Sequence, residues 1–148
     1  MQIRDRIKEL RRVKASELLP NPKNWRMHPT TQQDALRTVL AEVGYADALI
    51  ARETDRGLML VDGHLRAEIT PDAEVPVLIL DINEAESDVI LTTLDPLAAM
   101  AEANTEALRN LTESIPTDND HIQTLLASIL EANNAVLNDT GIQTKLYY

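Results

Sequence analysis

The run Val75–Asp81, VPVLILD, is the segment that most restricts how this chain can fold. Before it, Thr70-Pro71-Asp72 interrupts regular secondary structure. The near-continuous apolar composition of the run predicts a strand of the kind usually buried on both faces. Residues 48–53 and 58–61 flank a turn-forming TDRG segment and predict a hairpin. Together these segments predict a small mixed sheet.

The other segments favour helices. Residues 31–43 place apolar side chains at three- and four-residue spacing and stop at Gly44, as expected for an amphipathic helix. Residues 2–10 predict a short charged helix, and residues 12–15 a first strand. Beyond Asn83 the chain predicts only helices, over 84–94, 96–103, 105–114 with Asn104 or Thr105 as cap, and 118–133 with Asp118 as cap. The expected fold class is α+β, a small mixed sheet with packed helices and an all-helical C-terminal extension.

Composition excludes several classes of protein. The chain of 148 residues has no cysteine, which removes disulfides, thiolate zinc sites and cysteine nucleophiles. No apolar run approaches the roughly 18 residues of a membrane span, and the charged start lacks the apolar stretch of a secretory signal. The sequence therefore predicts a cytoplasmic protein with no membrane partner.

The formal net charge of −10 is unevenly distributed. Residues 1–28 hold eight of the fourteen basic residues against three acids, so this segment is net +5 and the remainder net −15. Such a basic N-terminal arm can steer an anionic partner toward one face, and DNA is the predicted partner. The alternative, that these charges only solvate a terminal segment, stays open. The predicted DNA-binding residues are Arg4, Lys8, Arg11 and Arg12.

The stretch VDGHLRAEI, residues 61–69, ends a strand in Asp62-Gly63 and begins a helix at once. A helix start presents free backbone N–H groups and the positive end of the helix dipole, which together bind anions such as phosphate. Arg66 lies one turn into the helix, where its guanidinium can hold a phosphate bidentately. His64 at the mouth can donate a hydrogen bond or act as acid or base. The structural alternative is a tight turn with Asp62 as helix cap.

The segment LPNPKNWRMHP, residues 19–29, carries three prolines and predicts an ordered surface loop, where functional residues concentrate. Asn24, Arg26 and Lys23 add polar and basic groups to the proposed phosphate site. Trp25 belongs either to this site or to the core. We expect Arg26 and Arg66 to converge on one anion.

These residues carry a family resemblance. LLPNPKNWR, a helix ending EVG, ALIARE, LMLVDGHLR and VPVLILDINEAES follow one another in the order and spacing of the N-terminal domain of ParB-like proteins, in the ParB/sulfiredoxin superfamily. Residues 10–95 resemble this domain, and NWR, DGHLR and TLDPLA resemble its stand-alone members in phages and mobile elements. The resemblance implies a ParB-like domain over 1–95 with a basic arm, a helical extension over 96–134, and a tail or linker over 135–148.

The resemblance also implies a ligand. Partition ParB proteins carry a phosphate-binding Gly-Glu-Arg-Arg box and bind and slowly hydrolyse CTP. Gly63 and Arg66 match the first and last positions of this box, whereas His64 and Leu65 replace its Glu and Arg. Where the second phosphate motif of the family belongs, near residues 91–100, the chain reads LTTLDPLAAM. A nucleoside triphosphate, CTP or ATP with Mg²⁺, is the implied cofactor.

Two relatives define the enzymatic alternatives. Sulfiredoxin needs a cysteine where His64 stands, so that activity is excluded. Free-serine kinases of the superfamily carry Asp-Gly-His-His-Arg, which DGHLR matches at four of five places. A phosphotransferase needs a carboxylate to accept the hydroxyl proton, and Asp62, Glu68 and Glu17 are of the required type. The predicted catalytic residues are Asp62, His64 and Glu68, for slow nucleotide hydrolysis or phosphotransfer.

No metal site is predicted from the protein's own side chains. His64 and Glu68 lie four apart on one helix face, but three histidines without cysteine make a poor ligand set. In the last helix an apolar stripe serves either a core or a homodimer. Its members are Leu125, Leu126, Ile129 and Leu130.

Three functions from different classes follow. The first, which we adopt as the prediction, is a nucleotide-binding domain associated with DNA transactions of a phage or mobile element. The second is a small-molecule kinase of the free-serine type. The third is a non-catalytic adaptor that pairs with another protein through its helical surface.

Overall fold

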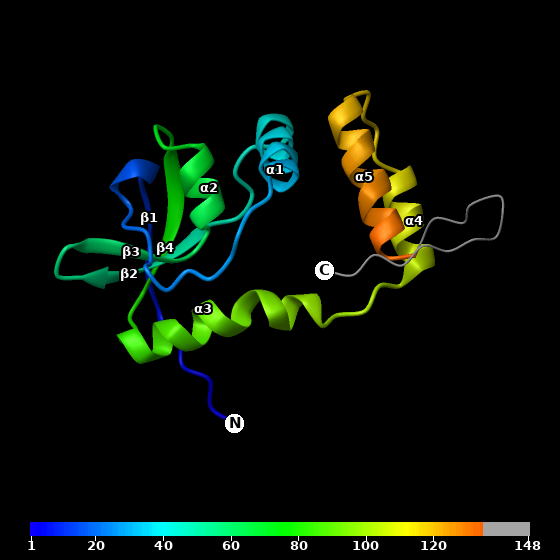
Figure 1. The fold of residues 1–148 in the computed structure, drawn as a ribbon. Coiled ribbons are helices and arrows are strands. Elements are labelled where there is room, and N and C mark those ends of the chain that lie inside the picture. Colours follow the sequence, from blue (N-terminus) through cyan, green and yellow to red (C-terminus); the bar gives the residue numbers. More distant parts are fainter. Residues whose placement is uncertain (135–148) are drawn as a thin grey trace. The chain divides into compact units, whose positions relative to one another are not determined.

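The computed structural model describes residues 1–134 and divides into two compact units, one over Met1–Ala98 and one beginning at Ala99 (Figure 1). The predicted tail or linker over 135–148 lies outside the described residues. No described helix is long and apolar enough to cross a membrane.

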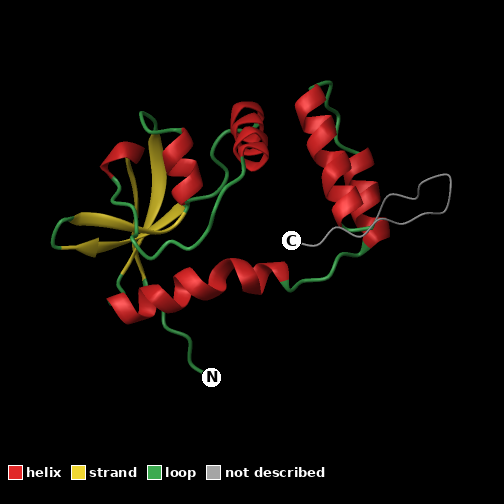
Figure 2. Cartoon of the chain, viewed as in Figure 1, coloured by secondary structure: helices red, strands yellow, loops and turns green. Residues whose placement is uncertain are grey.

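The first unit contains a four-stranded mixed sheet with the order β1-β4-β2-β3 (Figure 2). β2 (Leu49–Thr54) and β3 (Gly57–Asp62) form the predicted antiparallel hairpin. β4 (Glu74–Leu80) runs parallel to β2 and antiparallel to β1 (Ile7–Lys14). The predicted α+β class with a small mixed sheet is confirmed.

β1 corrects one prediction, because residues 2–10 form no helix. Ile7, Leu10 and Val13 recur every three residues, which resembles a helical pattern in the isolated sequence. Pairing with β4 overrides that local signal: Val13 lies opposite Val75 in the ladder. Register with a strand some sixty residues away cannot be read from one segment.

The core lies on one face of the sheet. In β4, Val75, Val77 and Ile79 are fully buried, whereas the alternate residues Pro76 and Leu78 are only partly covered. The apolar run of β4 therefore serves one core face and one partly covered face, and it is not buried equally on both. η1 (Ala15–Glu17) and α2 (His64–Ile69) contribute to the core. Its buried members are Ala15, Leu18, Leu49, Ala51, Leu60, Ala67, Val75, Val77 and Ile79.

Two longer helices complete the first unit. α1 (Thr30–Glu42) is the predicted amphipathic helix, and the chain leaves it through Gly44 at a φ of 94°. α3 (Glu84–Ala99) runs through Pro96, where two helices had been expected. Pro96 has no N–H to donate to the Thr92 carbonyl oxygen, but because it lies in the last turn this lost hydrogen bond falls at the end of the helix.

The described part of the second unit is a pair of helices, α4 (Thr105–Glu113) and α5 (Asp120–Ala132). Asn104 caps α4, as expected, by accepting the Ala107 N–H. α5 is capped by Asn119 and not by the predicted Asp118. No described residue of this unit is buried.

Candidate functional site

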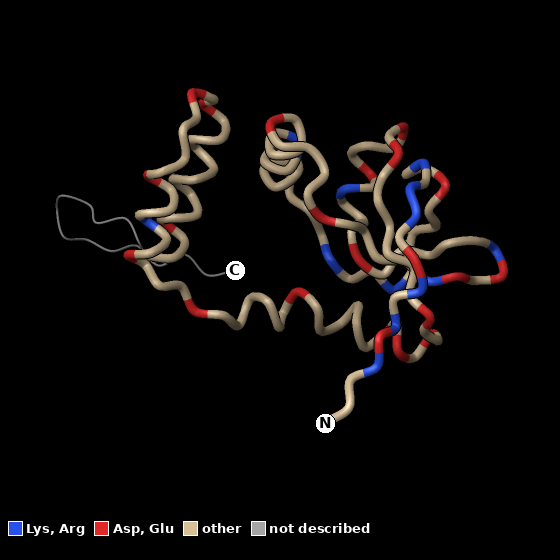
Figure 3. Tube along the Cα trace, turned by 180° about the vertical axis from the view of Figure 1, so that it is seen from behind, with Lys and Arg blue, Asp and Glu red and all other residues tan. Residues whose placement is uncertain are grey.

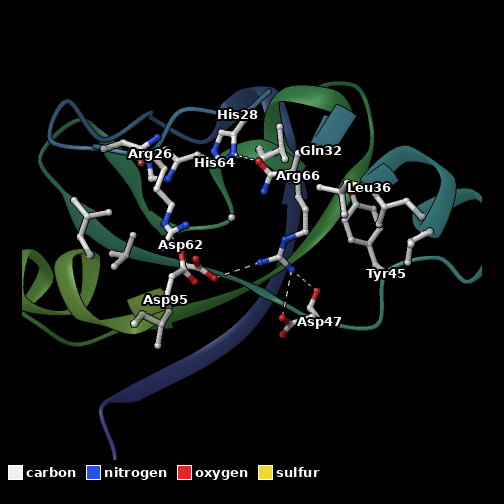
Figure 4. A pocket seen from close by; sticks show the side chains of 18 of the residues that line it. Arg26, His28, Gln32, Leu36, Tyr45, Asp47, Asp62, His64, Arg66 and Asp95 are labelled. Carbon is white, nitrogen blue, oxygen red and sulfur yellow. Dashed lines mark hydrogen bonds and ion pairs between the residues drawn. The ribbon is translucent and has the colours of Figure 1, made fainter. Parts of the chain in front are cut away.

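A pocket of about 440 Å³ lies in the first unit (Figure 4). The proline-rich loop, α1, the turn at 44–47, the junction of β3 with α2, and α3 all contribute to its lining. Five of the six residues predicted to bind phosphate line this cavity, namely Asn24, Arg26, Gly63, His64 and Arg66, and Lys23 does not. Its apolar wall includes Leu36, Val39, Leu40, Ile90, Leu91 and Leu94.

Gly63 permits the sharp passage from β3 into α2. Its φ is 100°, a left-handed conformation that favours glycine, and a Cβ there would lie 2.6 Å from Leu49 Cγ. The Gly63 N–H lies beside the Asp62 carboxylate and lowers its pKa slightly, and α2 has only six residues. The backbone amides of this turn thus offer less to an anion than expected, so side chains must supply most of any anion binding.

Arg66 lies in the pocket wall between two carboxylates (Figure 4). Nη2 is 3.4 Å from Asp62 Oδ2, and Nη1 is 3.7 Å from Asp47 Oδ2 and donates to the Asp47 carbonyl oxygen at 3.2 Å. The side chain is only 15% exposed. These contacts hold the guanidinium at the pocket without closing the cavity.

Arg26 reaches the same pocket from the loop. Its Nε lies 2.7 Å from Asp95 Oδ2 on α3, although this buried N–H is not aligned for a hydrogen bond. The guanidinium also stacks on the Trp25 ring, with Cζ 4.7 Å from the centroid. Trp25 is half exposed and lines the pocket, which removes it from the core.

His64 is buried in the pocket wall and serves as a hydrogen-bond acceptor. Its Nε2 accepts the backbone N–H of Asn21 at 3.2 Å. Burial lowers the pKa of His64, and the charge of His28 lowers it further. The neutral imidazole therefore carries its proton on Nδ1, and the Nε2 lone pair is already used.

The pocket carboxylate of Asp62 has a shifted pKa. Burial raises the pKa of Asp62, the charge of Asp95 raises it further, and Arg66 opposes both effects. Asp95 and Asp47 were not among the predicted site residues. For Asp95 the sequence held a positional signal, because TLDPLA falls where the second phosphate motif of the family belongs.

Other predicted site residues lie elsewhere. Asn24 lines the pocket, whereas Lys23 is outside its lining and pairs with Glu84 at 3.2 Å and Asp88 at 2.8 Å on α3. Glu68 is exposed and also lies outside the lining. Lys23 thus ties the loop to α3, and Glu68 is not positioned to act on a ligand in this cavity.

The predicted DNA-binding residues belong to β1 and the segment before it (Figure 3). Three of them are engaged by acids: Arg4 lies 4.0 Å from Glu86, Lys8 is 3.0 Å from Glu53, and Arg11 pairs with Glu9. Arg12 is exposed. Among the described residues no group of three or more His, Asp and Glu could hold a metal by itself.

Comparison with solved structures identifies the fold. No family model matches the chain, and no curated protein matches its sequence. The chain is similar to the crystal structure of C-terminally truncated chromosome-partitioning protein ParB from Caulobacter crescentus complexed with CTP-gamma-S. The TM-score is 0.62 at 14% identity, over 85% of this chain and 75% of that chain. The fold is that of a ParB-like N-terminal domain.

A Pnob8-like ParB-N domain is also similar, with 19% identity and a TM-score of 0.49, over 82% of this chain and 48% of that chain. The ParB-like fold confirms the resemblance found in the sequence. Membership of the phage or mobile-element type stays a prediction. In this ParB-like domain the pocket joins the loop bearing Arg26, the β3–α2 turn bearing Arg66, and α3.

Proposed function

We propose that this ParB-like domain binds a nucleotide in the pocket between the proline-rich loop, the β3–α2 turn and α3. One observation carries the proposal: Arg26 and Arg66, forty residues apart in sequence, line the same cavity of about 440 Å³. Guanidinium groups suit phosphate oxygens because their fork of donors matches two of them at once. The Caulobacter ParB was crystallised with a CTP analogue, which supports a nucleotide as the ligand.

The charges of the pocket restrict the form of the ligand. Two arginines face the carboxylates of Asp47, Asp62 and Asp95, so the lining is not positive overall. A polyphosphate would therefore bind best with a divalent cation, which screens its charge. Mg²⁺ commonly takes one or two protein carboxylates plus substrate phosphates. Asp95, whose contact is an exposed ion pair, would supply such a carboxylate, and the cation would stabilise charge on the phosphates.

A thermal-shift panel of CTP and ATP, with and without Mg²⁺, tests the proposal. A nucleotide at one hundred times its Kd should stabilise the native state by about 2.7 kcal/mol. Arg66→Ala and Arg26→Ala should each remove most of the shift. Arg37→Ala is the matched control, since Arg37 lies on the exposed side of α1 and pairs only with Asp34 among the contacts described. A wild-type protein that no nucleotide stabilises, or pocket variants that respond like the control, would contradict nucleotide binding.

Turnover is a separate part of the proposal. Of the predicted catalytic residues, Asp62 and His64 line the pocket and Glu68 does not. Slow hydrolysis or phosphotransfer would therefore depend on Asp62 as the proton acceptor. Release of phosphate from nucleotide, measured with and without free serine, separates hydrolysis from a kinase activity. Loss of that release in Asp62→Asn with nucleotide binding retained is the expected result.

DNA association completes the proposal, with Arg12 as its best candidate contact because it is exposed on β1. Binding through phosphates should weaken steeply with salt. Arg12→Ala should weaken it uniformly across sequences, whereas Arg56→Ala, in the exposed β2–β3 turn, should not. A DNA affinity that does not change with salt concentration would contradict this role.

A further inference from the structure

The loop that carries Trp25 and Arg26 is anchored near its start by Asn21, in addition to the contacts that Lys23, Trp25 and Arg26 make with α3. The side chain of Asn21 is buried, and its Nδ2 donates to the Leu60 carbonyl oxygen on β3 at 3.1 Å. Its Oδ1 accepts the Lys23 N–H at 3.0 Å, and its carbonyl oxygen accepts the Asn24 N–H at 3.0 Å. The position of Asn21 therefore fixes where the rest of the loop begins.

The remaining polar group of Asn21, its backbone N–H, donates to His64 Nε2 at 3.2 Å. Both residues are buried, so water does not readily replace this bond. His64 begins α2 directly after Gly63, at a point where a Cβ on Gly63 would lie 2.6 Å from Leu49 Cγ. The bond joins the start of the loop to the start of α2 across 43 positions of sequence.

We propose that His64 is a positioning residue: as a neutral acceptor it holds the loop of residues 21–28 against α2, and its protonation releases that loop. The effect on nucleotide binding rests on the function proposed above, whereas the effect on the loop does not. The held loop presents Arg26 and Trp25 to the pocket. A released loop would withdraw one of the two guanidinium groups.

Protonation acts through the geometry of this one bond. A protonated imidazole presents an N–H at Nε2 toward the N–H of Asn21, so two donors face each other and neither finds an acceptor. Burial lowers the pKa of His64 because the charged ring is poorly solvated there, and the charge of His28 on the loop adds to this. The titratable and charged groups that line the same cavity are Arg26 and His28 of the loop, Tyr45 and Asp47 of the turn, Asp62 of β3, Arg66 of α2 and Asp95 of α3.

The direction of the pH dependence follows from this lowered pKa. The released loop exposes His64, which then binds a proton near the ordinary value of about 6.5. The docked loop resists protonation to a lower pH. Between the two pKa values the ratio of docked to released loop should fall up to tenfold per pH unit as the pH falls. Above that window the docked loop keeps its full stability.

Trp25 provides a direct measurement that needs no nucleotide. It is the single tryptophan of the chain, and its Nε1 donates to the Leu91 carbonyl oxygen on α3 at 3.1 Å. Its emission should therefore shift when the loop leaves α3. We would titrate the emission of the full chain from pH 8 to pH 5 in wild type, His64→Gln and His64→Leu. His28→Gln and His121→Gln are the controls for the other two histidines.

The expected pattern is specific to an acceptor at position 64. Wild type and both controls should show a transition below pH 6.5. His64→Gln, whose amide oxygen accepts a hydrogen bond at every pH, should keep the docked emission throughout. His64→Leu should show the released emission even at pH 8. A transition that persists in His64→Gln, or a docked loop in His64→Leu, would overturn the proposal.

A second measurement on the wild-type protein avoids variants that fail to fold. Nitrogen NMR of the imidazole should show His64 at pH 8 with its proton on Nδ1 and a bare Nε2. A proton on Nε2 of His64 in the folded chain at pH 8 would contradict the proposal. CTP and ATP affinity, measured across the same pH range, forms a separate arm: if no nucleotide binds while the Trp25 transition occurs, the proposed function fails and the role of His64 stands.

Discussion

Any side chain at position 63 would destabilise the fold in two ways, through the left-handed backbone conformation of this residue and through its close packing against Leu49. A non-glycine residue in a left-handed conformation costs roughly 1–2 kcal/mol, and overpacking a core costs typically about 1–3 kcal/mol more. Gly63→Ala places its Cβ 2.6 Å from Leu49 Cγ, so we expect a loss of about 2–5 kcal/mol in the free energy of unfolding. Urea denaturation measures this loss.

Gly44 is the matched control for that substitution. Its φ is 94°, but a Cβ there would meet no atom within 4 Å. Gly44→Ala should therefore lose only the backbone contribution, roughly 1–2 kcal/mol. Equal losses in the two variants would mean that the contact with Leu49 is unimportant.

Glu86 at the start of α3 is held by Arg6. Hydrogen bonds from the Arg6 guanidinium, followed by one from the Asn83 N–H, lower the pKa of Glu86 from its ordinary value of 4.5 to about 2. Because the folded pKa is lowered, the stabilisation is present above pH 4.5 and is lost as the pH falls toward 2. In Arg6→Ala the pKa of Glu86, measured by NMR, should rise toward its ordinary value, while the Asn83 N–H still lowers it. Lys8→Ala, which removes a cation paired with Glu53, should leave the pKa of Glu86 unchanged.

The stability contributed by Asp62 depends on pH in the opposite direction. Its pKa is raised, chiefly by burial and then by Asp95, so its charge destabilises the fold as the pH rises through that range. Asp62→Asn should raise the melting temperature at pH 7 and tighten nucleotide binding several-fold, and the gain in melting temperature should shrink near pH 3. Asp47→Asn, at an exposed carboxylate, is the control and should not raise the melting temperature at pH 7. A destabilised Asp62→Asn at neutral pH would show that its bond to Arg66 outweighs its burial.

At the scale of single elements, the sequence predicted segments with strong local signals and failed where distant contacts decide. The β2–β3 hairpin, α1 and the short α2 follow directly from turn chemistry and apolar spacing. β1 did not, because its structure depends on β4 and not on its own pattern. α3 continues through Pro96, so the helix break that a proline predicts from the isolated segment is absent.

Asn119 and Asp118 are the two candidates for the N-cap of α5, and substitutions distinguish them. Asn119 accepts the N–H groups of His121 and Ile122 at 2.9 and 3.1 Å, whereas the sequence favoured Asp118. Asn119→Ala should cost about 1 kcal/mol of local stability, since a cap is typically worth that amount. Hydrogen exchange at the first turn of α5 reports it. Faster exchange in Asp118→Ala than in Asn119→Ala would restore Asp118 as the cap.

At the scale of the whole molecule, the candidate site was predictable in part. Spacing and residue type indicated that Arg26 and Arg66 belong together, and the structure brings both to one pocket. Of the facing carboxylates, Asp95 had only the position of TLDPLA as a signal and Asp47 had none, because each joins the site through a contact that forms only in the fold. The role of His64 as a hydrogen-bond acceptor could not be predicted either, because its donor is the backbone N–H of Asn21 and a pattern of side chains does not indicate such a contact.

The two units differ in how much they can bury. All core residues of the chain's described part belong to the first unit, and the described part of the second has none. We therefore expect residues 1–100 to unfold cooperatively on their own and residues 101–134 to show little helix alone, because short helices need tertiary packing. Circular dichroism of the two fragments checks this. A stably helical second fragment would contradict it; the homodimer predicted through α4 and α5 stays a prediction.

The pairing of β1 with β4 has a consequence for biosynthesis. The first strand leaves the ribosome some sixty residues before its partner, whereas β2 and β3 can join as soon as their turn emerges. Closing so long a loop is slow compared with forming a hairpin. During that interval IKELRRVK stays unpaired in the nascent chain, and its five charged residues oppose the strand-to-strand association that an apolar segment would invite.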